Sequence, residues 1–170
     1  MKVMIVANIS ADGKVLLSDN PYHPLPQEAM DFYLKLARKV GNLIIGAKTF
    51  ENFRRFPTNV KALFDGIEIV VLSSEPIYTD FAVTGSPEEA LAYLAKKGYK
   101  DIAIGGGTGV FNAFLNADLV TDIFFNVSPL ITGDGGDLGT LQGLNTNFKF
   151  MSSDVNANYA QLHLAKSNRT

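Results

Sequence analysis

The alternation of short apolar runs with stretches of helical periodicity restricts this chain to the α/β class. Apolar runs typical of buried strands cover residues 3–9, 43–45, 67–72, 102–104 and 123–127. After the first run, apolar residues recur every three or four positions from Pro26 to Gly41, as on the buried face of a helix. A second helix is predicted from Ser86, which opens a capping box with proline at the next position, to Gly98. We therefore expect a mostly parallel, twisted sheet with helices on both faces.

The end of the chain has a different pattern. Apolar runs at 148–152 and 159–166 flank Asp154, Asn156 and Asn158, which predicts an antiparallel hairpin at one edge of the sheet. Shorter elements are expected as a strand at 81–83, a helix from its N-cap Thr49 through Phe53, and a helix at 110–115. No repeat, low-complexity tract or linker interrupts the sequence, so we expect one domain over residues 1–170.

Composition excludes several classes of function. The net charge is −2 and the basic residues are scattered, whereas a nucleic-acid-binding protein carries a basic face. The chain has no Cys, and its imidazoles, His23 and His163, lie far apart, so we predict neither a disulfide nor a metal site. No apolar run approaches the roughly 20 residues of a membrane span, and residues 1–7 are too short for a signal peptide. We expect a cytoplasmic protein without membrane or nucleic-acid partners.

A cluster of glycines follows the predicted strand at 102–104. It comprises Gly105, Gly106, Gly107, Thr108, Gly109 and Val110. Consecutive glycines let backbone N–H groups approach a pyrophosphate closely, and the N-terminus of the next helix adds a favourable dipole. A tight turn is the alternative, although four glycines in five residues exceed what a turn needs. The Rossmann fingerprint is excluded, because these glycines come late in the chain and Asp122 begins a strand instead of ending one.

Two further strand ends carry residues suited to a ligand. Gly46, Lys48 and Thr49 follow the run at 43–45, and Ser73 and Ser74 follow the run at 67–72. Taken separately, each segment is more typical of an ordinary turn. In open α/β sheets, however, ligands bind at the carboxyl ends of the strands, where these segments are expected to meet the glycines.

Glu28 has two interpretations. It lies in the first turn of the first predicted helix, just after Leu25-Pro26 and one turn before Phe32. A carboxylate there ordinarily stabilises the helix through its dipole, and the residues alone favour this interpretation. At the mouth of an apolar pocket the same carboxylate would have a raised pKa suited to proton transfer.

The order of these segments resembles the dihydrofolate reductase superfamily over nearly the whole chain. The motifs that carry the resemblance are Leu25-Pro26-Gln27-Glu28, Gly46-Ala47-Lys48-Thr49-Phe50, Leu72-Ser73-Ser74-Glu75-Pro76 and Ile104-Gly105-Gly106-Gly107. The turn Ser10-Ala11-Asp12-Gly13-Lys14-Val15 and the segments 118–122 and 129–135 are similar to the pyrimidine reductases of riboflavin synthesis, the RibD C-terminal type. Each motif alone is weak, but four in this order are specific for the superfamily.

The resemblance implies a nicotinamide cofactor, NADPH or alternatively NADH, across the strand ends. Gly105 to Val110 would hold the pyrophosphate, Gly46, Lys48 and Thr49 the adenosine side, and Ser73 and Ser74 the adenine ribose. Ala7 and Asn8 would lie near the nicotinamide, with Val15 covering it. Glu28 would be the acidic residue and Phe32 the aromatic residue that hold the heterocyclic substrate.

Three departures from the family pattern bear on cofactor and substrate. Ala47 and Thr108 stand where the family commonly has arginines that hold the 2′-phosphate of NADPH, which weakens a preference for NADPH over NADH. Ile67 stands where folate enzymes have the arginine that binds the folate carboxylate. Because a guanidinium fork is the natural partner of a carboxylate, its loss argues against ordinary folate as substrate.

The predicted function is that of an NAD(P)H-dependent reductase that transfers hydride to a pteridine- or pyrimidine-type heterocycle. Dihydrofolate and a ribosylaminopyrimidine phosphate are the two candidate substrates, the second as in the 5-amino-6-(5-phosphoribosylamino)uracil reductases. Arg54, Arg55 and Lys61 would then meet the substrate phosphate, unless they form a solvated face. The alternatives are a non-catalytic dinucleotide-binding module on the same fold, or a fold whose glycines only form a turn. The riboflavin branch also implies a homodimer.

Overall fold

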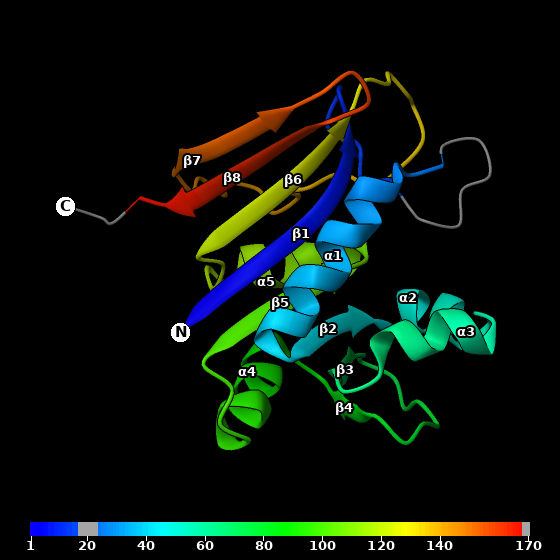
Figure 1. Ribbon diagram of the computed structural model, residues 1–170. Helices are drawn as coiled ribbons and strands as arrows, with labels where there is room; N and C mark the ends of the chain where they lie inside the picture. The colour runs from blue at the N-terminus through cyan, green and yellow to red at the C-terminus, as the bar shows by residue number, and fades with distance from the viewer. Residues whose placement is uncertain (17–23, 168–170) are drawn as a thin grey trace.

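The computed structural model describes residues 1–16 and 24–167, which build an eight-stranded sheet in the order β4-β3-β2-β5-β1-β6-β8-β7 (Figure 1). The strands are β1 (Lys2–Ser10), β2 (Asn42–Gly46), β3 (Glu68–Leu72), β4 (Ala82–Thr84), β5 (Asp101–Gly106), β6 (Asp122–Ser128), β7 (Phe148–Val155) and β8 (Ala160–Lys166). The six strands from β4 to β6 pair in parallel, whereas β8 pairs antiparallel with both β6 and β7. The predicted α/β class, the parallel sheet and the C-terminal antiparallel hairpin are confirmed.

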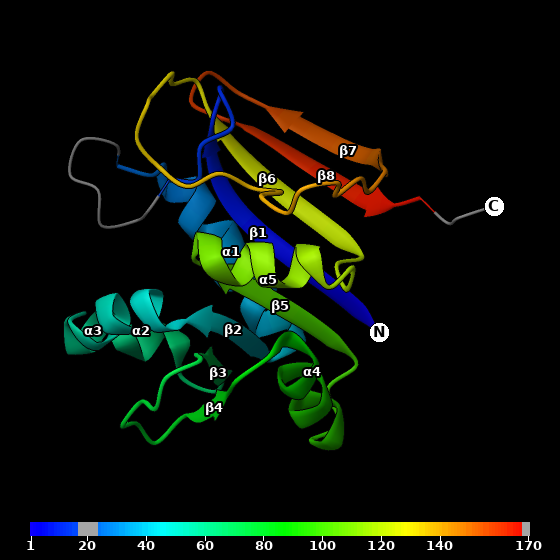
Figure 2. The ribbon, with the colours of Figure 1, turned by 180° about the vertical axis from the view of Figure 1, so that it is seen from behind.

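Helices cover both faces of the sheet, because side chains alternate between the faces along every buried strand. In β2, Leu43 and Ile45 pack with α1 (Gln27–Val40), α2 (Ala47–Arg54) and the short helix η1 (Ala62–Phe64). Ile44 between them packs on the opposite face with α4 (Pro87–Lys96) and α5 (Thr108–Asn116). Figures 1 and 2 show α1 in front of the sheet and α4 and α5 behind it.

The two long predicted helices begin and end as the sequence indicates. Pro26 is the N-cap of α1, and Gly41 closes the helix in the left-handed conformation, with its N–H 2.8 Å from the Ala37 carbonyl oxygen. At the start of α4 the Ser86 hydroxyl accepts a hydrogen bond from the Glu89 N–H at 3.2 Å, which confirms the capping interaction.

Several element boundaries differ from the prediction. Thr49 is not the N-cap of its helix, because α2 begins at Ala47 and Gly46 is its N-cap. The helix expected at 110–115 begins at Thr108. The strand β7 runs through Asp154 to Val155, so the hairpin turn is shorter than expected. The short helix α3 (Thr58–Lys61) and η1 were not predicted, since segments of three or four residues carry too little periodicity to detect.

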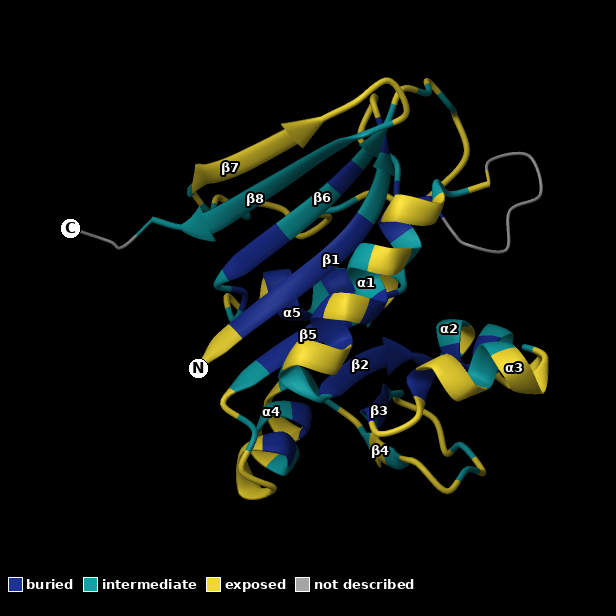
Figure 3. Cartoon of the chain, viewed as in Figure 1, coloured by how far each residue is buried: buried dark blue, intermediate teal, exposed yellow. Residues whose placement is uncertain are grey.

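Burial falls from the centre of the sheet toward the hairpin (Figure 3). β2 is buried at every position, whereas β7 is exposed at all but its first residue. Among the described residues, no helix is long and apolar enough to cross a membrane. The same residues contain no group of three His, Cys, Asp or Glu side chains that could hold a metal ion, and His23 lies outside them.

Candidate functional site

A groove of about 980 Å³ runs along the carboxyl ends of β2, β3 and β5. These strands end at Gly46, Leu72 and Gly106. Most of the residues predicted to hold a cofactor line this groove, namely Gly46, Lys48, Thr49, Ser73, Ser74, Gly107, Thr108, Gly109 and Val110. The parallel topology brings the three segments together, as expected for an open α/β sheet.

Two helix N-termini face the groove. Gly46 is the N-cap of α2 and Gly107 the N-cap of α5, and no side chain caps either of these fully described helices. The first backbone N–H groups of each helix therefore have no intrahelical or side-chain acceptor. Uncapped amides and the positive ends of two helix dipoles suit a pyrophosphate.

The glycines at the strand ends let the two helices approach each other. A Cβ atom at Gly46 would lie 2.8 Å from Cγ2 of Val110, so a larger residue would separate α2 from the start of α5. Gly109 meets no atom within 4 Å of the position its Cβ would take, so the backbone of the first turn of α5 is open to the groove. The peptide bond between Gly106 and Gly107 is cis. The groove is thus a cradle of backbone, which fits the predicted pyrophosphate.

The charge of the groove is not strongly positive. Among the described lining residues, Lys48 is the one cation, while Glu51 and Glu75 contribute carboxylates. The Ser73 hydroxyl is held by its own loop, donating to the Glu75 carbonyl oxygen at 2.8 Å and accepting from the Glu75 N–H at 3.1 Å. Arg54, which could supply a second cation, pairs with Glu51 at 3.2 Å and does not line the groove.

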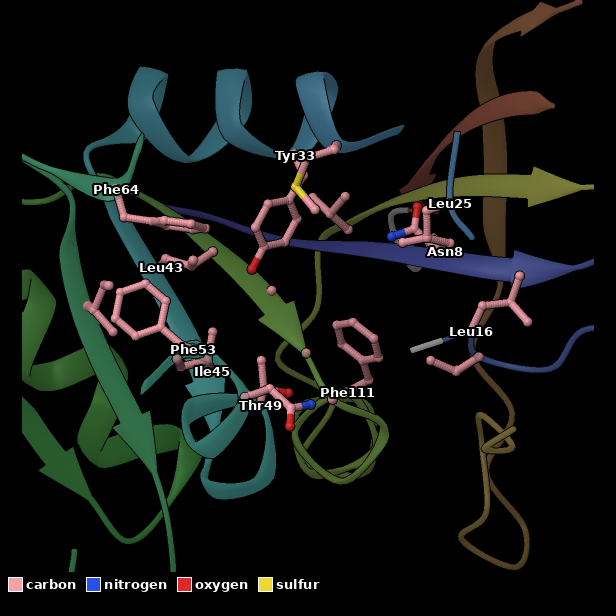
Figure 4. Close-up of a pocket in the computed structure, with 18 of the residues that line it drawn as sticks. Asn8, Leu16, Leu25, Tyr33, Leu43, Ile45, Thr49, Phe53, Phe64 and Phe111 are labelled. Atoms are coloured by element: carbon pink, nitrogen blue, oxygen red, sulfur yellow. The ribbon is translucent and has the colours of Figure 1, made fainter. Parts of the chain in front are cut away.

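A second cavity, the chamber, lies on the α1 face of the sheet next to the groove (Figure 4). Its volume is about 100 Å³, and its walls are mostly apolar: Val6, Val15, Leu16, Leu25, Met30, Leu43, Ile45, Phe53, Phe56, Phe64, Ile69 and Phe111. Thr49, Asn52 and Gly107 line both the chamber and the groove. The groove and the chamber therefore adjoin at these three residues.

Tyr33 is the aromatic polar residue of the chamber. Figure 4 shows its ring projecting from α1 into the cavity, with the hydroxyl at the tip. Burial raises the pKa of Tyr33 far above its usual value, so the phenol stays neutral. This hydroxyl is close enough to Gly105 that a Cβ atom there would overlap it. The hydroxyl is thus a neutral donor aimed into an apolar cavity.

The predicted substrate residues are divided between the chamber and other places. Asn8 lines the chamber, whereas Ala7 is fully buried in the core on the opposite face of β1. Phe32 packs against Phe124, with ring centroids 5.2 Å apart, and does not line the chamber. Its neighbour Tyr33 lines it instead.

Glu28 is exposed and is not one of the described residues that line the chamber. Burial, and then the charges of Asp154 and Glu28, raise the pKa of Tyr159, which lies between β7 and β8. The catalytic role of Glu28 stays a prediction. Of the other predicted residues, Val15 is buried in a chamber wall, and Gly105 and Gly106 form part of its floor.

Sequence reasoning missed several residues of the chamber, namely Tyr33, Asn52, Phe53, Phe56 and Phe64. Phe32 and Tyr33 are adjacent, and helical periodicity tolerates either one on the buried face. Phe53 and Phe64 read as ordinary core residues, and nothing local distinguishes a cavity wall from a filled core. Arg55 and Lys61, the other residues predicted to meet a phosphate, line neither cavity.

The fold is thus an α/β sheet whose strand ends carry a groove next to an apolar chamber. Residues 1–162 match the family described as the RibD C-terminal domain, and the chain belongs to that family. The uncharacterized protein YwjB of Bacillus subtilis (strain 168) is 25% identical over 173 residues, which cover 98% of this chain and 98% of YwjB.

Solved structures share the fold at lower identity. A putative riboflavin biosynthesis protein from Shewanella sp. PV-4 superposes with a TM-score of 0.73 at 19% identity, over 99% of this chain and 100% of the other. Dihydrofolate reductase from Enterococcus faecalis, solved with NADP(H) and RAB-propyl, gives a TM-score of 0.71 at 21% identity, over 98% of this chain and 97% of the enzyme. At these identities the likeness shows the fold alone.

Proposed function

We propose that this protein is a nicotinamide-dependent reductase that binds NADPH or NADH in the groove and a heterocyclic substrate in the chamber. The observation that carries the proposal is that the groove and the chamber share the lining residues Thr49, Asn52 and Gly107. A dinucleotide in the groove would place one end beside these residues, next to the chamber. Membership of the RibD C-terminal domain family supports a reductase.

The groove would hold the cofactor mainly through backbone. The uncapped N-termini of α2 and α5 would bind the pyrophosphate, and Ser74 and Lys48 would meet the adenosine end. When bound, the nicotinamide supplies the hydride, which the protein itself cannot provide. With Lys48 as the one cation among the described lining residues, the groove offers little to distinguish a 2′-phosphate from a 2′-hydroxyl.

The chamber would orient the acceptor ring and exclude water. Its apolar walls remove solvent from the ring, and Tyr33 and Asn8 offer hydrogen bonds at fixed positions. We infer that the acceptor is a C=N or C=O bond of a pteridine- or pyrimidine-type ring. The proton that follows the hydride would come through water or from Glu28, since the raised pKa of Tyr33 makes its phenol a hydrogen-bond donor and a poor acid.

The first test is cofactor binding, measured as thermal stabilisation with NADPH and, separately, with NADH. A ligand that binds only the folded state stabilises it by about 2.7 kcal/mol at 100 times its dissociation constant. For a chain of this length that corresponds to roughly 5–10 °C in Tm. No shift with either cofactor at about 1 mM, a concentration that reveals even weak specific binding, would refute the reductase.

The non-catalytic dinucleotide-binding module makes a different prediction in the same experiment. It would give the thermal shift but no oxidation of the cofactor in the presence of dihydrofolate or the ribosylaminopyrimidine phosphate. Cofactor oxidation with either heterocycle, followed by the absorbance of the reduced nicotinamide, would exclude the module and identify the substrate branch.

A further inference from the structure

A row of three side-chain amides crosses the sheet beside the chamber. Asn8 on β1 pairs in register with Asn126 on β6, and Asn126 pairs in register with Gln161 on β8. Neighbours in register point to the same face of a sheet, so the three carboxamides line up across three strands. Asn126, at the centre, is 2% exposed.

Hydrogen bonds along this row run in one direction. Gln161 Nε2 donates to Asn126 Oδ1 at 3.0 Å, and Asn126 Nδ2 donates to Asn8 Oδ1 at 3.1 Å. The side-chain oxygens of Asn126 and Asn8 therefore each accept a hydrogen bond from the neighbouring amide of the row. The group left over at the end of the row is the amino group of Asn8. Asn8 cannot turn over alone without losing its bond to Asn126, so its orientation changes only when the whole row reverses.

The remaining amino group faces the chamber. Asn8 is one of the chamber residues, and Figure 4 shows its carboxamide nitrogen on the side of the cavity. Its backbone is also fixed, because the Asn8 carbonyl oxygen accepts a hydrogen bond of 2.8 Å from the N–H of Leu16, another chamber residue. An oriented donor at an apolar wall discriminates strongly between ligands, because a ligand that offers it no acceptor leaves a buried polar group without a hydrogen bond, which costs binding free energy.

We propose that the Asn8–Asn126–Gln161 row sets the hydrogen-bond polarity of the chamber, so that the bound ring must present an acceptor, a carbonyl oxygen or an unprotonated ring nitrogen, to Asn8. Asn126 and Gln161 are positioning residues that never touch the ligand. This proposal rests on the proposed function only in taking the chamber as the place of the substrate ring.

A substitution at the far end of the row should reverse it. In Gln161→Glu the new carboxylate only accepts, so Asn126 must donate to it and turn its Oδ1 toward Asn8. Asn8 then donates to Asn126 and turns its own oxygen into the chamber. Gln161 is partly exposed, so the carboxylate is solvated there, although Asp154 pairs with this position on β7. Gln161→Met is the matched control, because it removes the bond without reversing the row.

The experiment uses two small rings of nearly equal size and opposite polarity, pyridine as acceptor and pyrrole as donor. Each is titrated to about 20 mM at neutral pH against the full chain, and the Asn8 side-chain resonances are followed by NMR to give a dissociation constant. We expect the wild-type protein to favour pyridine by roughly three- to tenfold, the value of one net hydrogen bond. The ratio should invert in Gln161→Glu and approach unity in Gln161→Met.

Equal affinities in the wild-type protein, an unchanged ratio in Gln161→Glu, or no response of Asn8 to either ring would overturn the proposal. The Tm of each variant serves as the control for folding. If the ratio of pyridine to pyrrole affinity changes while Tm does not, the change reports the orientation of the amide row and not a loss of stability. The titration requires neither cofactor nor turnover. A negative result for the amide row is therefore distinguishable from a negative result for the proposed reductase function, which cofactor binding tests separately.

Discussion

Gly105→Ala tests whether the Tyr33 hydroxyl packs against the backbone of β5 as the structure shows. A Cβ atom at residue 105 would overlap the Tyr33 hydroxyl and would lie 2.9 Å from Tyr33 Cζ and 2.8 Å from Leu43 Cδ1. Real Cβ atoms do not approach other atoms so closely, so the tyrosine ring must move toward the chamber. Overpacking of this kind costs about 1–3 kcal/mol.

Part of that cost is offset in the unfolded state. Replacing glycine by alanine at an accessible backbone conformation stabilises a protein by about 0.4–1 kcal/mol, because the unfolded chain loses freedom. Gly105 is not one of the glycines with positive φ, so this gain applies in full. The net expectation is a loss centred on about 1.3 kcal/mol, which lowers Tm by roughly 3–5 °C for a chain of this length.

Gly109→Ala is the matched control for this measurement. It makes the same chemical change in a helix, and no atom lies within 4 Å of the new Cβ position. It should therefore raise stability by about 0.5–1 kcal/mol. Urea denaturation of both variants gives the difference, and Gly105→Ala combined with Tyr33→Phe should recover part of the loss. Equal stabilisation by the two alanines would refute the packing of Tyr33 against Gly105.

Four other substitutions separate the parts of the site and of the fold. Gly109→Asp places a carboxylate at the uncapped start of α5. It should weaken the binding of NADPH and NADH by about tenfold or more, while the Tm of the protein without cofactor stays unchanged or rises. Unchanged affinity would show that α5 is not part of the cofactor site. If Glu28 delivers the proton, Glu28→Gln should lower turnover and leave cofactor affinity unaltered; equal turnover in this variant would exclude the Glu28 carboxylate as the proton donor. Tyr33→Phe should instead raise KM, because it removes a hydrogen-bond donor from the chamber. The bonds from Lys97 and Tyr93 lower the pKa of Glu68 below its usual value near 4.5, so its stabilising effect is complete above that value and is lost as pH falls through the lower folded pKa. The stability difference between wild type and Glu68→Gln should accordingly shrink on acidification from neutral pH to about pH 3, and a pH-independent difference would contradict the assignment.

Much of the groove could be predicted from the sequence because its signals are local. Strand ends, glycines and helix starts lie within a few residues of one another at 46–49, 73–74 and 105–110, and a parallel α/β topology brings such ends to one edge. The capping of α4 by Ser86 and the closing of α1 at Gly41 were predictable for the same reason. Helix boundaries such as the start of α2 could not be predicted. The sequence offers Thr49 as an N-cap, whereas the structure uses Gly46.

The sequence by itself determined the alternation of strands and helices, the family and the glycine-rich strand ends that line the groove, all of which depend on residues close in the chain. Only the tertiary structure decided which side chains enter the chamber. The packing of α1 on the sheet puts Tyr33 in the chamber and leaves Phe32 against Phe124. The row from Gln161 to Asn8 exists only through strand pairing, since Asn126 is 118 positions from one partner and 35 from the other, and no local pattern encodes such a register.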